Sequence, residues 1–264
     1  MEVSQRIAVT GMLASQRQLD VVSNNLANVS STGFKRAVAH TTDTGYQAGL
    51  TAAVGPGGAN VRLVGVGQGT HIADVTNEFM PGALEGTGNS LDAALQGDGF
   101  FQVNMPDGTP GYTRDGTFAL DATGQLVTSG GMQVQSETGA PMVVPANSID
   151  ARFDDTGQLV ATDITGTDQI VGRLAVAQFP NNAGLQANGQ NLWTPTVASG
   201  TATPVVQGAA TAPLIVAGAL EGSNVSMADE FTRLIQAQRG YQINSKVVQA
   251  WDDISRMSND LRSA

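Results

Sequence analysis

The sequence contains no cysteine among its 264 residues, which excludes disulfides, thiolate catalysis and cysteine-based metal sites. Aromatic residues are scarce at 5%, whereas glycine is abundant, with 32 residues. No apolar run approaches the roughly 18 residues that a membrane-spanning helix needs. The opening stretch MEVSQRIAVTGM lacks the basic start and long apolar core of a signal peptide. We therefore expect turn-rich β-structure around a modest core, and any export to proceed without a cleaved signal peptide.

Positive charge is also scarce, because 13 Lys and Arg residues are outnumbered by 23 Asp and Glu, for a net charge of -10. Residues 1–36 carry +2 and residues 227–264 carry 0, which leaves -12 for the middle of the chain. A nucleic-acid-binding role would need a basic face, and the sequence offers none. Near-neutral ends can pack against copies of themselves without strong repulsion, and we expect the acidic middle to face water.

Residues that carry chemistry are few and poorly spaced for catalysis or metal binding. The two histidines, His40 and His71, have no further ligand at metal-binding spacing. The carboxylate pair Asp154-Asp155 falls in a turn signal, where adjacent side chains diverge. The segment GVGQG at 65–69 resembles a phosphate loop only loosely, because no Lys-Ser/Thr follows it. We expect no catalytic residue, no cofactor and no metal site, and hence no enzyme.

A heptad pattern indicates a long helix within residues 1–36. Gly33 suits a helix stop there, since glycine adopts the left-handed conformation without a Cβ clash. Apolar or small residues recur at alternating spacings of four and three, at Ala8, Met12, Ser15, Leu19, Val22, Leu26 and Val29.

Residues 214–264 indicate a connector followed by a second long helix. Ser226 and Asp229 match a capping box, and Asp229 and Glu230 suit the positive end of the helix dipole. Gly240 leaves two interpretations open: close approach of another helix, or simple tolerance at a cost of about 1 kcal/mol. A second heptad stripe comprises Ile243, Val247, Ala250, Ile254, Met257 and Leu261, and is extended upstream by Phe231, Leu234, Ile235 and Tyr241.

Between the two helices the pattern changes to β-structure. Residues 37–94 indicate a linker and an extended or β connector, with a Gly-Pro-Gly-Gly tract at 55–58 that we expect to be flexible. Residues 95–213 show short apolar runs separated by turn signals, and their last part, 194–213, indicates a loop or irregular edge. Tight turns between strands are predicted by Asp-Gly at 107–108 and 115–116, and by Asp-x-Thr-Gly-Gln-Leu-Val at 121–127 and 154–160.

The fold class that follows is α+β. We expect the N- and C-terminal helices to pair as a coiled-coil-like stalk, with a β-rich middle domain of antiparallel hairpins. An isolated heptad helix leaves its stripe in water and gains little stability from propensity alone. Each stripe therefore needs a partner, either the other stripe or the same stripes on other copies.

Three blocks of the sequence resemble flagellar basal-body rod and hook proteins. Their order along the chain is that of the family, and length and details favour its distal-rod branch. The alternatives are another rod subunit or a hook protein, and more remotely a phage-tail-like β-structural protein. The blocks are LDVVSNNLANVSSTGFKR at 19–36, LDAALQGDGFFQV at 91–103 continued by YTRDG at 112–116, and SNV at 223–225 followed by IQAQRGYQINSK at 235–246.

The resemblance implies a structural subunit that polymerises into a hollow helical drive shaft and transmits torque from motor to hook. The helices at the two ends of the chain would line the inner tube, and the β-rich domain would form the outer layer. The implied partners are copies of the chain itself, neighbouring rod subunits, the hook protein, the P-ring and L-ring proteins where the cell has them, and the flagellar type III export apparatus. The implied location is the flagellar basal body, spanning the periplasm.

We expect the subunit interface to lie on the two stripes and the asparagine-rich end of the first helix. The asparagines either bridge subunits or end the helix locally, and we favour the first interpretation. The basic doublet Lys35-Arg36 is interpreted as charge that complements the helix C-terminus. The predicted interface residues are Ala8, Met12, Leu19, Val22, Asn24, Asn25, Leu26, Asn28, Val29, Phe231, Leu234, Tyr241, Ile243, Val247, Ile254, Met257 and Leu261.

Overall fold

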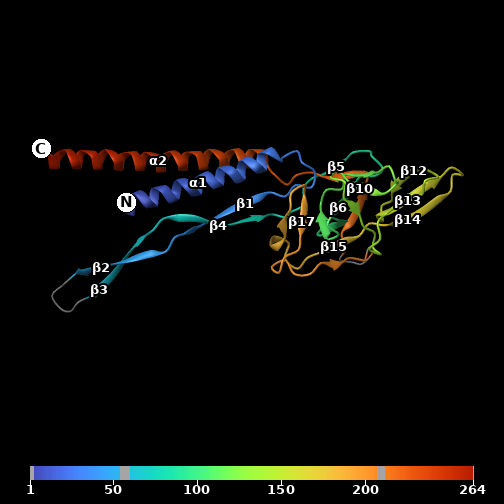
Figure 1. The fold of residues 1–264 in the computed structure, drawn as a ribbon, viewed down its shortest axis with the longest axis horizontal. Coiled ribbons are helices and arrows are strands. Elements are labelled where there is room, and N and C mark those ends of the chain that lie inside the picture. Colours follow the sequence, from blue (N-terminus) through green and yellow to red (C-terminus); the bar gives the residue numbers. More distant parts are fainter. Residues whose placement is uncertain (1–2, 54–59, 207, 209–211, 264) are drawn as a thin grey trace. The chain divides into compact units, whose positions relative to one another are not determined.

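The structure, a computed structural model, describes residues 3–53, 60–206, 208 and 212–263 (Figure 1). Two long helices and a β-rich middle of antiparallel sheets confirm the α+β class. The Gly-Pro-Gly-Gly tract at 55–58 lies outside the described residues, as do 207 and 209–211 of the expected loop. The chain divides into unit 1, with residues 1–27, 37–76 and 226–264, and unit 2, with residues 28–36 and 77–225.

Unit 1 holds both helices and a long β-ribbon. Strand β2 pairs antiparallel with β3, and β1 pairs with β4, so the part of the chain from β1 to β4 doubles back on itself (Figure 1). Over their described residues, neither helix combines the length and apolar character needed to cross a bilayer. The elements are α1 (Val3–Ala27), β1 (Ala37–Asp43), β2 (Tyr46–Ala53), β3 (Asn60–Gly67), β4 (Thr70–Asn77) and α2 (Met227–Ser263).

The two helices lie side by side and run antiparallel (Figure 1). Near one end of the pair, Gln5 Nε2 donates to Asp252 Oδ1 at 3.3 Å. Near the other end, Asn25 Nδ2 donates to Glu230 Oε2 at 3.2 Å. This register leaves the last turns of α2, beyond Asp252, past the start of α1.

Small residues allow the two helices to approach closely between those ends. A Cβ placed on Gly11 would stand 2.7 Å from Asn244 Nδ2, and one on Gly240 would stand 3.1 Å from Ser15 Oγ. Ala237 is buried on the same face of α2. Of the two interpretations of Gly240, the structure therefore favours close approach of another helix.

The helix ends depend on side chains near them. Ser226 Oγ accepts a hydrogen bond from the Asp229 backbone N–H at 3.5 Å, which confirms the cap predicted for α2. The stop predicted at Gly33 is wrong, because α1 ends at Ala27. The polar run that follows Ala27 competes with the helix for backbone hydrogen bonds. Gly33 does adopt a positive φ of 66°, but in a turn six residues beyond the helix.

Unit 2 is a β-structure of short antiparallel strands. Its largest sheet runs in the order β16-β17-β8-β7-β11-β10-β9; β15 joins it by pairing with β7, and β18 pairs with β15. A three-stranded sheet, β12-β13-β14, and the pairs β6-β19 and β5-β20 complete the described part. The elements are β5 (Leu84–Gly86), β6 (Ala93–Gln96), β7 (Phe100–Asn104), β8 (Pro110–Thr113), β9 (Phe118–Leu120), β10 (Leu126–Thr128), β11 (Gln133–Val134), β12 (Ser148–Phe153), β13 (Gln158–Asp163), β14 (Asp168–Arg173), β15 (Val176–Gln178), a 3₁₀ turn (Asn182–Gly184), β16 (Gln186–Ala187), β17 (Leu192–Thr194), β18 (Thr203–Pro204), β19 (Leu214–Ala217) and β20 (Ala219–Glu221).

The two repeated Asp-x-Thr-Gly units form the tight turns that the sequence predicts. In each turn the aspartate Oδ1 accepts hydrogen bonds from the threonine hydroxyl and from the backbone N–H of the second and fourth following residues. Gly124 and Gly157 adopt φ values of 78° and 74°, which glycine tolerates without strain. The turns connect β9 to β10 and β12 to β13.

The two Asp-Gly pairs behave differently from each other. Gly108 has a φ of 81° and closes the predicted turn between β7 and β8. The turn predicted at Asp115-Gly116 is wrong, since β8 and β9 on either side pair with other strands. Glycine is required at 116 for another reason: a Cβ there would overlap the carbonyl oxygen of Ala93.

Most of the scarce aromatic residues gather in unit 2. Phe101, Phe118 and Phe153 pack edge to face in the main core, where they contact buried Leu, Val and Ala side chains. A second cluster joins Phe100, Phe179, Tyr112, Trp193 and Phe79 through further edge-to-face contacts. Aromatic rings therefore lie in both hydrophobic clusters of unit 2, and in the first they pack among many aliphatic side chains.

Candidate assembly surface and buried polar cluster

The heptad stripe of α2 is exposed to solvent in the single chain. Ile243 is 63% exposed, Ile254 55%, Met257 65% and Leu261 80%. Phe231, Tyr241 and Val247, all predicted interface residues, are exposed too. An apolar row of this length is a characteristic of a protein–protein contact surface, because isolated exposed apolar residues are common but contiguous ones are not.

The face of α2 that meets α1 is a different one. It carries Glu230, Ala237, Gly240 and Asn244, which are buried or half-buried. The predicted stripe of α2 is therefore not what packs on α1, and a large apolar face stays available on the same helix. Leu234 is the half-buried member of the predicted set on α2.

The predicted interface residues of α1 are mostly covered within their own chain. Ala8, Val22 and Asn25 are buried, and Asn24 is exposed. The other members are half-buried: Met12, Leu19, Leu26, Asn28 and Val29. The stripe of α1 thus contributes mainly to packing within the chain, whereas that of α2 faces outward.

Asn25 and Asn28 make hydrogen bonds within their own chain. Asn25 Oδ1 accepts from the Ala37 backbone N–H at 2.9 Å, and its Nδ2 donates to the Ala37 carbonyl at 2.8 Å. With the bond to Glu230, Asn25 has three partners and is only 1% exposed. Asn28 Oδ1 accepts from the Ser31 hydroxyl at 3.1 Å. Asn28 thus has a local partner, whereas Asn25 bonds residues 12 and 205 positions away in its own chain. Bridging between subunits stays a prediction.

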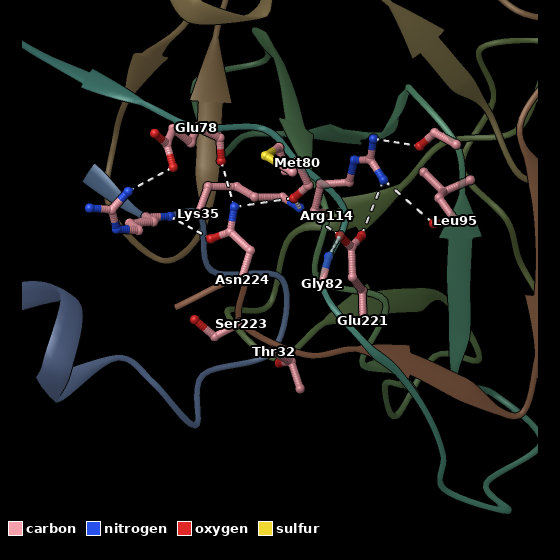
Figure 2. Close-up of polar contacts among 12 residues, drawn as sticks. Thr32, Lys35, Glu78, Met80, Gly82, Leu95, Arg114, Glu221, Ser223 and Asn224 are labelled. Atoms are coloured by element: carbon pink, nitrogen blue, oxygen red, sulfur yellow. Dashed lines mark hydrogen bonds and ion pairs between the residues drawn. The ribbon is translucent and has the colours of Figure 1, made fainter. Parts of the chain in front are cut away.

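A buried cluster of charged residues in unit 2 joins residues of the first two sequence blocks to Glu221, which stands two residues before the third block (Figure 2). Glu221 Oε1 accepts from Lys35 Nζ at 2.5 Å and from the Gly82 backbone N–H at 2.9 Å. Glu221 Oε2 forms an ion pair with Arg114 Nη1 at 3.1 Å. The side chains of Lys35, Arg114 and Glu221 are all fully buried.

The cluster contains two cations and one anion. Burial is the main influence on the pKa of Lys35 and lowers it, although the adjacent Glu221 carboxylate acts in the opposite direction. Burial likewise lowers the pKa of Arg114, again opposed by Glu221. Backbone carbonyls are further acceptors for both cations: Lys35 donates to Met80 at 2.9 Å, and Arg114 donates to Gly97 at 2.7 Å. Removing one partner of such a buried set typically costs about 3–5 kcal/mol.

Our interpretation of the basic doublet as helix-capping charge is therefore wrong. Lys35 lies eight residues beyond the end of α1 and is enclosed by unit 2. Arg36 Nη1 forms an ion pair with Glu78 Oε2 at 2.8 Å. Glu221 is 186 residues from Lys35 in sequence, and Glu78 is 42 residues from Arg36. The doublet alone therefore could not predict these ion pairs.

Asn224 is a second residue whose role sequence reasoning missed. Its Oδ1 accepts from the Arg36 backbone N–H at 2.8 Å, and its Nδ2 donates to the carbonyls of Glu78 and Met80 at 2.7 and 3.1 Å (Figure 2). Both amide hydrogens and the amide oxygen are thus used. The available signal was the position of Asn224 within the Ser-Asn-Val block.

The two histidines make ordinary contacts with neighbouring strands. His40 Nε2 lies 2.8 Å from Thr76 Oγ1, and His71 Nδ1 lies 3.5 Å from Thr44 Oγ1. Within the part of the chain that the structure describes, no three His, Asp or Glu side chains gather in a geometry that would hold a metal ion.

Comparisons with known proteins match the same three regions of the chain. Residues 6–35 match the model of the flagella basal body rod protein family, residues 94–161 that of the flagellar hook protein FlgE/F/G D1 domain, and residues 216–261 that of the flagellar basal body rod FlgEFG protein C-terminal region.

Individual relatives agree over nearly the full length. The chain is 39% identical to the flagellar basal-body rod protein FlgG of Buchnera aphidicola, covering 97% of this chain and 98% of that protein. It is 37% identical to FlgG of Bacillus subtilis, over 93% and 94%. The flagellar hook protein FlgE of Helicobacter mustelae is 45% identical, but over only 48% of this chain and 29% of its own.

Proposed function

The chain belongs to the FlgG family of flagellar basal-body rod proteins, and from that membership we propose that its copies assemble through an exposed helix face. It is a structural subunit of the distal rod and acts with other rod and hook subunits in the flagellum. The hook alternative is disfavoured, because similarity to a hook protein covers less than half of the chain.

The observation that carries the proposal is the pair of distinct faces on α2. One face is occupied by α1 of the same chain, through residues as small as Gly240 and Ala237. The other presents the heptad row from Ile243 to Leu261 to solvent. A heptad row of large apolar residues suits the knobs-into-holes packing of a coiled coil. We propose that a helix of a neighbouring copy covers it.

Charge supports the same arrangement of layers. The two chain ends carry +2 and 0, whereas residues 37–226 carry -12. Bringing many copies together costs least electrostatically where the segments are nearly neutral. We propose that the segments 1–36 and 214–264 line the inner tube, and that the β-rich domain from 95 to 213 forms the outer layer.

The wider setting follows from the family. We propose that the assembled subunits form a hollow shaft that spans the periplasm and transmits torque from motor to hook. The P-ring and L-ring proteins, where present, would surround it, and the flagellar type III apparatus would export the chain without a cleaved signal peptide. A shaft needs torsional stiffness, which close-packed helices supply because packed interiors resist deformation. No step of this role calls for catalysis.

Ile254→Asp tests the assembly surface. A carboxylate in the exposed row should leave the single chain folded, because Ile254 is already 55% exposed. The same carboxylate would be desolvated in a helix–helix contact, at a cost of several kcal/mol. We expect circular dichroism to show normal unfolding of the purified chain, and electron microscopy to show no tubes.

Ile170→Asp is the matched control, because Ile170 is 70% exposed on β14 in unit 2. It should form tubes as the unaltered protein does. Full-length tubes from Ile254→Asp would contradict the assigned surface.

A further inference from the structure

The chain passes between unit 1 and unit 2 four times, after residues 27, 36, 76 and 225. At three of these crossings, after residues 36, 76 and 225, the adjoining segments of unit 2 are hydrogen-bonded to one another. The connecting segments are 33–36, 78–82 and 221–224, which lie far apart in sequence. We call the bonded set the collar.

Asn224 ties all three segments of the collar together. Its amide bonds the backbone of Arg36 in the first segment and the backbones of Glu78 and Met80 in the second. The first two segments also bond directly, since the Glu78 backbone N–H donates to the Arg36 carbonyl at 2.8 Å. The ion pair between Arg36 and Glu78 lies beside that bond.

Glu221, three residues before Asn224, also bonds both of the other segments. Its carboxylate holds Lys35 of the first segment and the Gly82 backbone of the second. Its own carbonyl accepts from the Gly33 backbone N–H at 2.7 Å. Arg114 anchors the same carboxylate to the main β-structure. Every segment of the collar is therefore bonded to both of the others.

We propose that Asn224 and Glu221 are positioning residues that bind the three connecting segments into one rigid collar. A load on any one segment is then shared by all three and by unit 2. Pulling one segment free would break several bonds at once and leave buried polar groups unpaired, which makes separation costly. The mechanical part of this inference rests on the proposed function, whereas the coupling of the segments does not.

Hydrogen exchange on the full-length chain tests the coupling. In Asn224→Ala, the backbone amides of Arg36 and Glu78 should exchange at least about tenfold faster, because local opening no longer breaks shared bonds. The amides of the β7–β8 ladder should be unchanged. Ser223→Ala is the matched control, since its hydroxyl accepts a local bond from the Val225 backbone N–H at 3.3 Å, and it should leave both collar amides unchanged.

A milder variant covers the case in which Asn224→Ala fails to fold. Glu78→Gln removes the partly exposed ion pair with Arg36 and leaves the buried groups in place. It should speed exchange at the Arg36 amide by about two- to fivefold. The proposed collar would be contradicted if the Arg36 amide exchanged at an unchanged rate in both variants. It would also be contradicted if amide exchange became equally faster across the whole of unit 2.

Cells that carry Asn224→Ala separate the collar from the proposed function. Tubes should still form, but swimming speed should fall more steeply than in the unaltered strain as viscosity rises. Ser223→Ala cells should match the unaltered strain. Undiminished swimming at high viscosity would overturn the mechanical role. If the unaltered protein formed no tubes, the proposed function would fail, and the exchange result would still decide whether the collar exists.

Discussion

Single aspartates set the geometry of the two repeated turns in unit 2. Asp121 uses one carboxylate oxygen to accept from the Thr123 hydroxyl and from two backbone N–H groups, which include that of Gln125. Those hydrogen bonds, that of Thr123 first, hold the pKa of Asp121 below its usual value. A folded-state pKa that is lowered contributes stability above the unfolded pKa, and that contribution is lost as pH falls through the folded value.

Asp121→Asn should therefore destabilise the protein at neutral pH and matter less in acid. At pH 7 the variant replaces a charged acceptor with a weaker neutral one, whereas at pH values below its lowered pKa the unaltered side chain is itself protonated. Urea unfolding of both proteins at several pH values measures this. The gap between their midpoints should narrow as the pH falls from about 5 toward 3. A gap that is independent of pH would contradict the assigned role of the carboxylate.

Lys35 illustrates where residue-level reasoning from sequence stops. A basic doublet after a helix has a sufficient local explanation, and the sequence alone cannot show that Glu221 stands beside it. Conversely, the Asp-x-Thr-Gly turns were predictable because every bond that forms them lies within five residues. Local bonding is visible in sequence, whereas buried pairs across 107 or 186 residues require the fold.

At the scale of elements, the two helices were predictable from periodicity but their contact face was not. A heptad pattern identifies an apolar stripe without saying which neighbour covers it. The face that α2 turns toward α1 contains Gly240 and Asn244, which no count of apolar residues would select. The end of α1 was misplaced for a related reason: Gly33 carries a stop signal, but Asn28 and the hydroxyl residues after it act earlier.

Gly240→Val tests the close approach of the helices. A Cβ at this position already stands 3.1 Å from Ser15 Oγ, and the two added methyl groups would need further space. Overpacking of this kind costs about 1–3 kcal/mol, and we expect a lower helical melting temperature by circular dichroism. Ala250→Val, at an exposed site on the same helix, should cost no more than the difference in helix propensity, roughly 0.7 kcal/mol. Equal effects of the two variants would argue against a close contact at Gly240.

At the scale of the whole molecule, the separation of charge from apolar surface predicts how assembly responds to salt. The exposed row on α2 is apolar, and the net charge of -12 resides in residues 37–226. Copies that associate through near-neutral helices bring their acidic middles closer together, and that repulsion is screened over about 10 Å at 0.1 M salt. Light scattering should therefore show faster tube growth as salt rises from about 0.01 M to 0.15 M, a range over which the screening length falls from about 30 to 8 Å. Attraction between opposite charges would give the reverse trend, so slower growth with added salt would mean that ion pairs, and not the apolar row, drive the association.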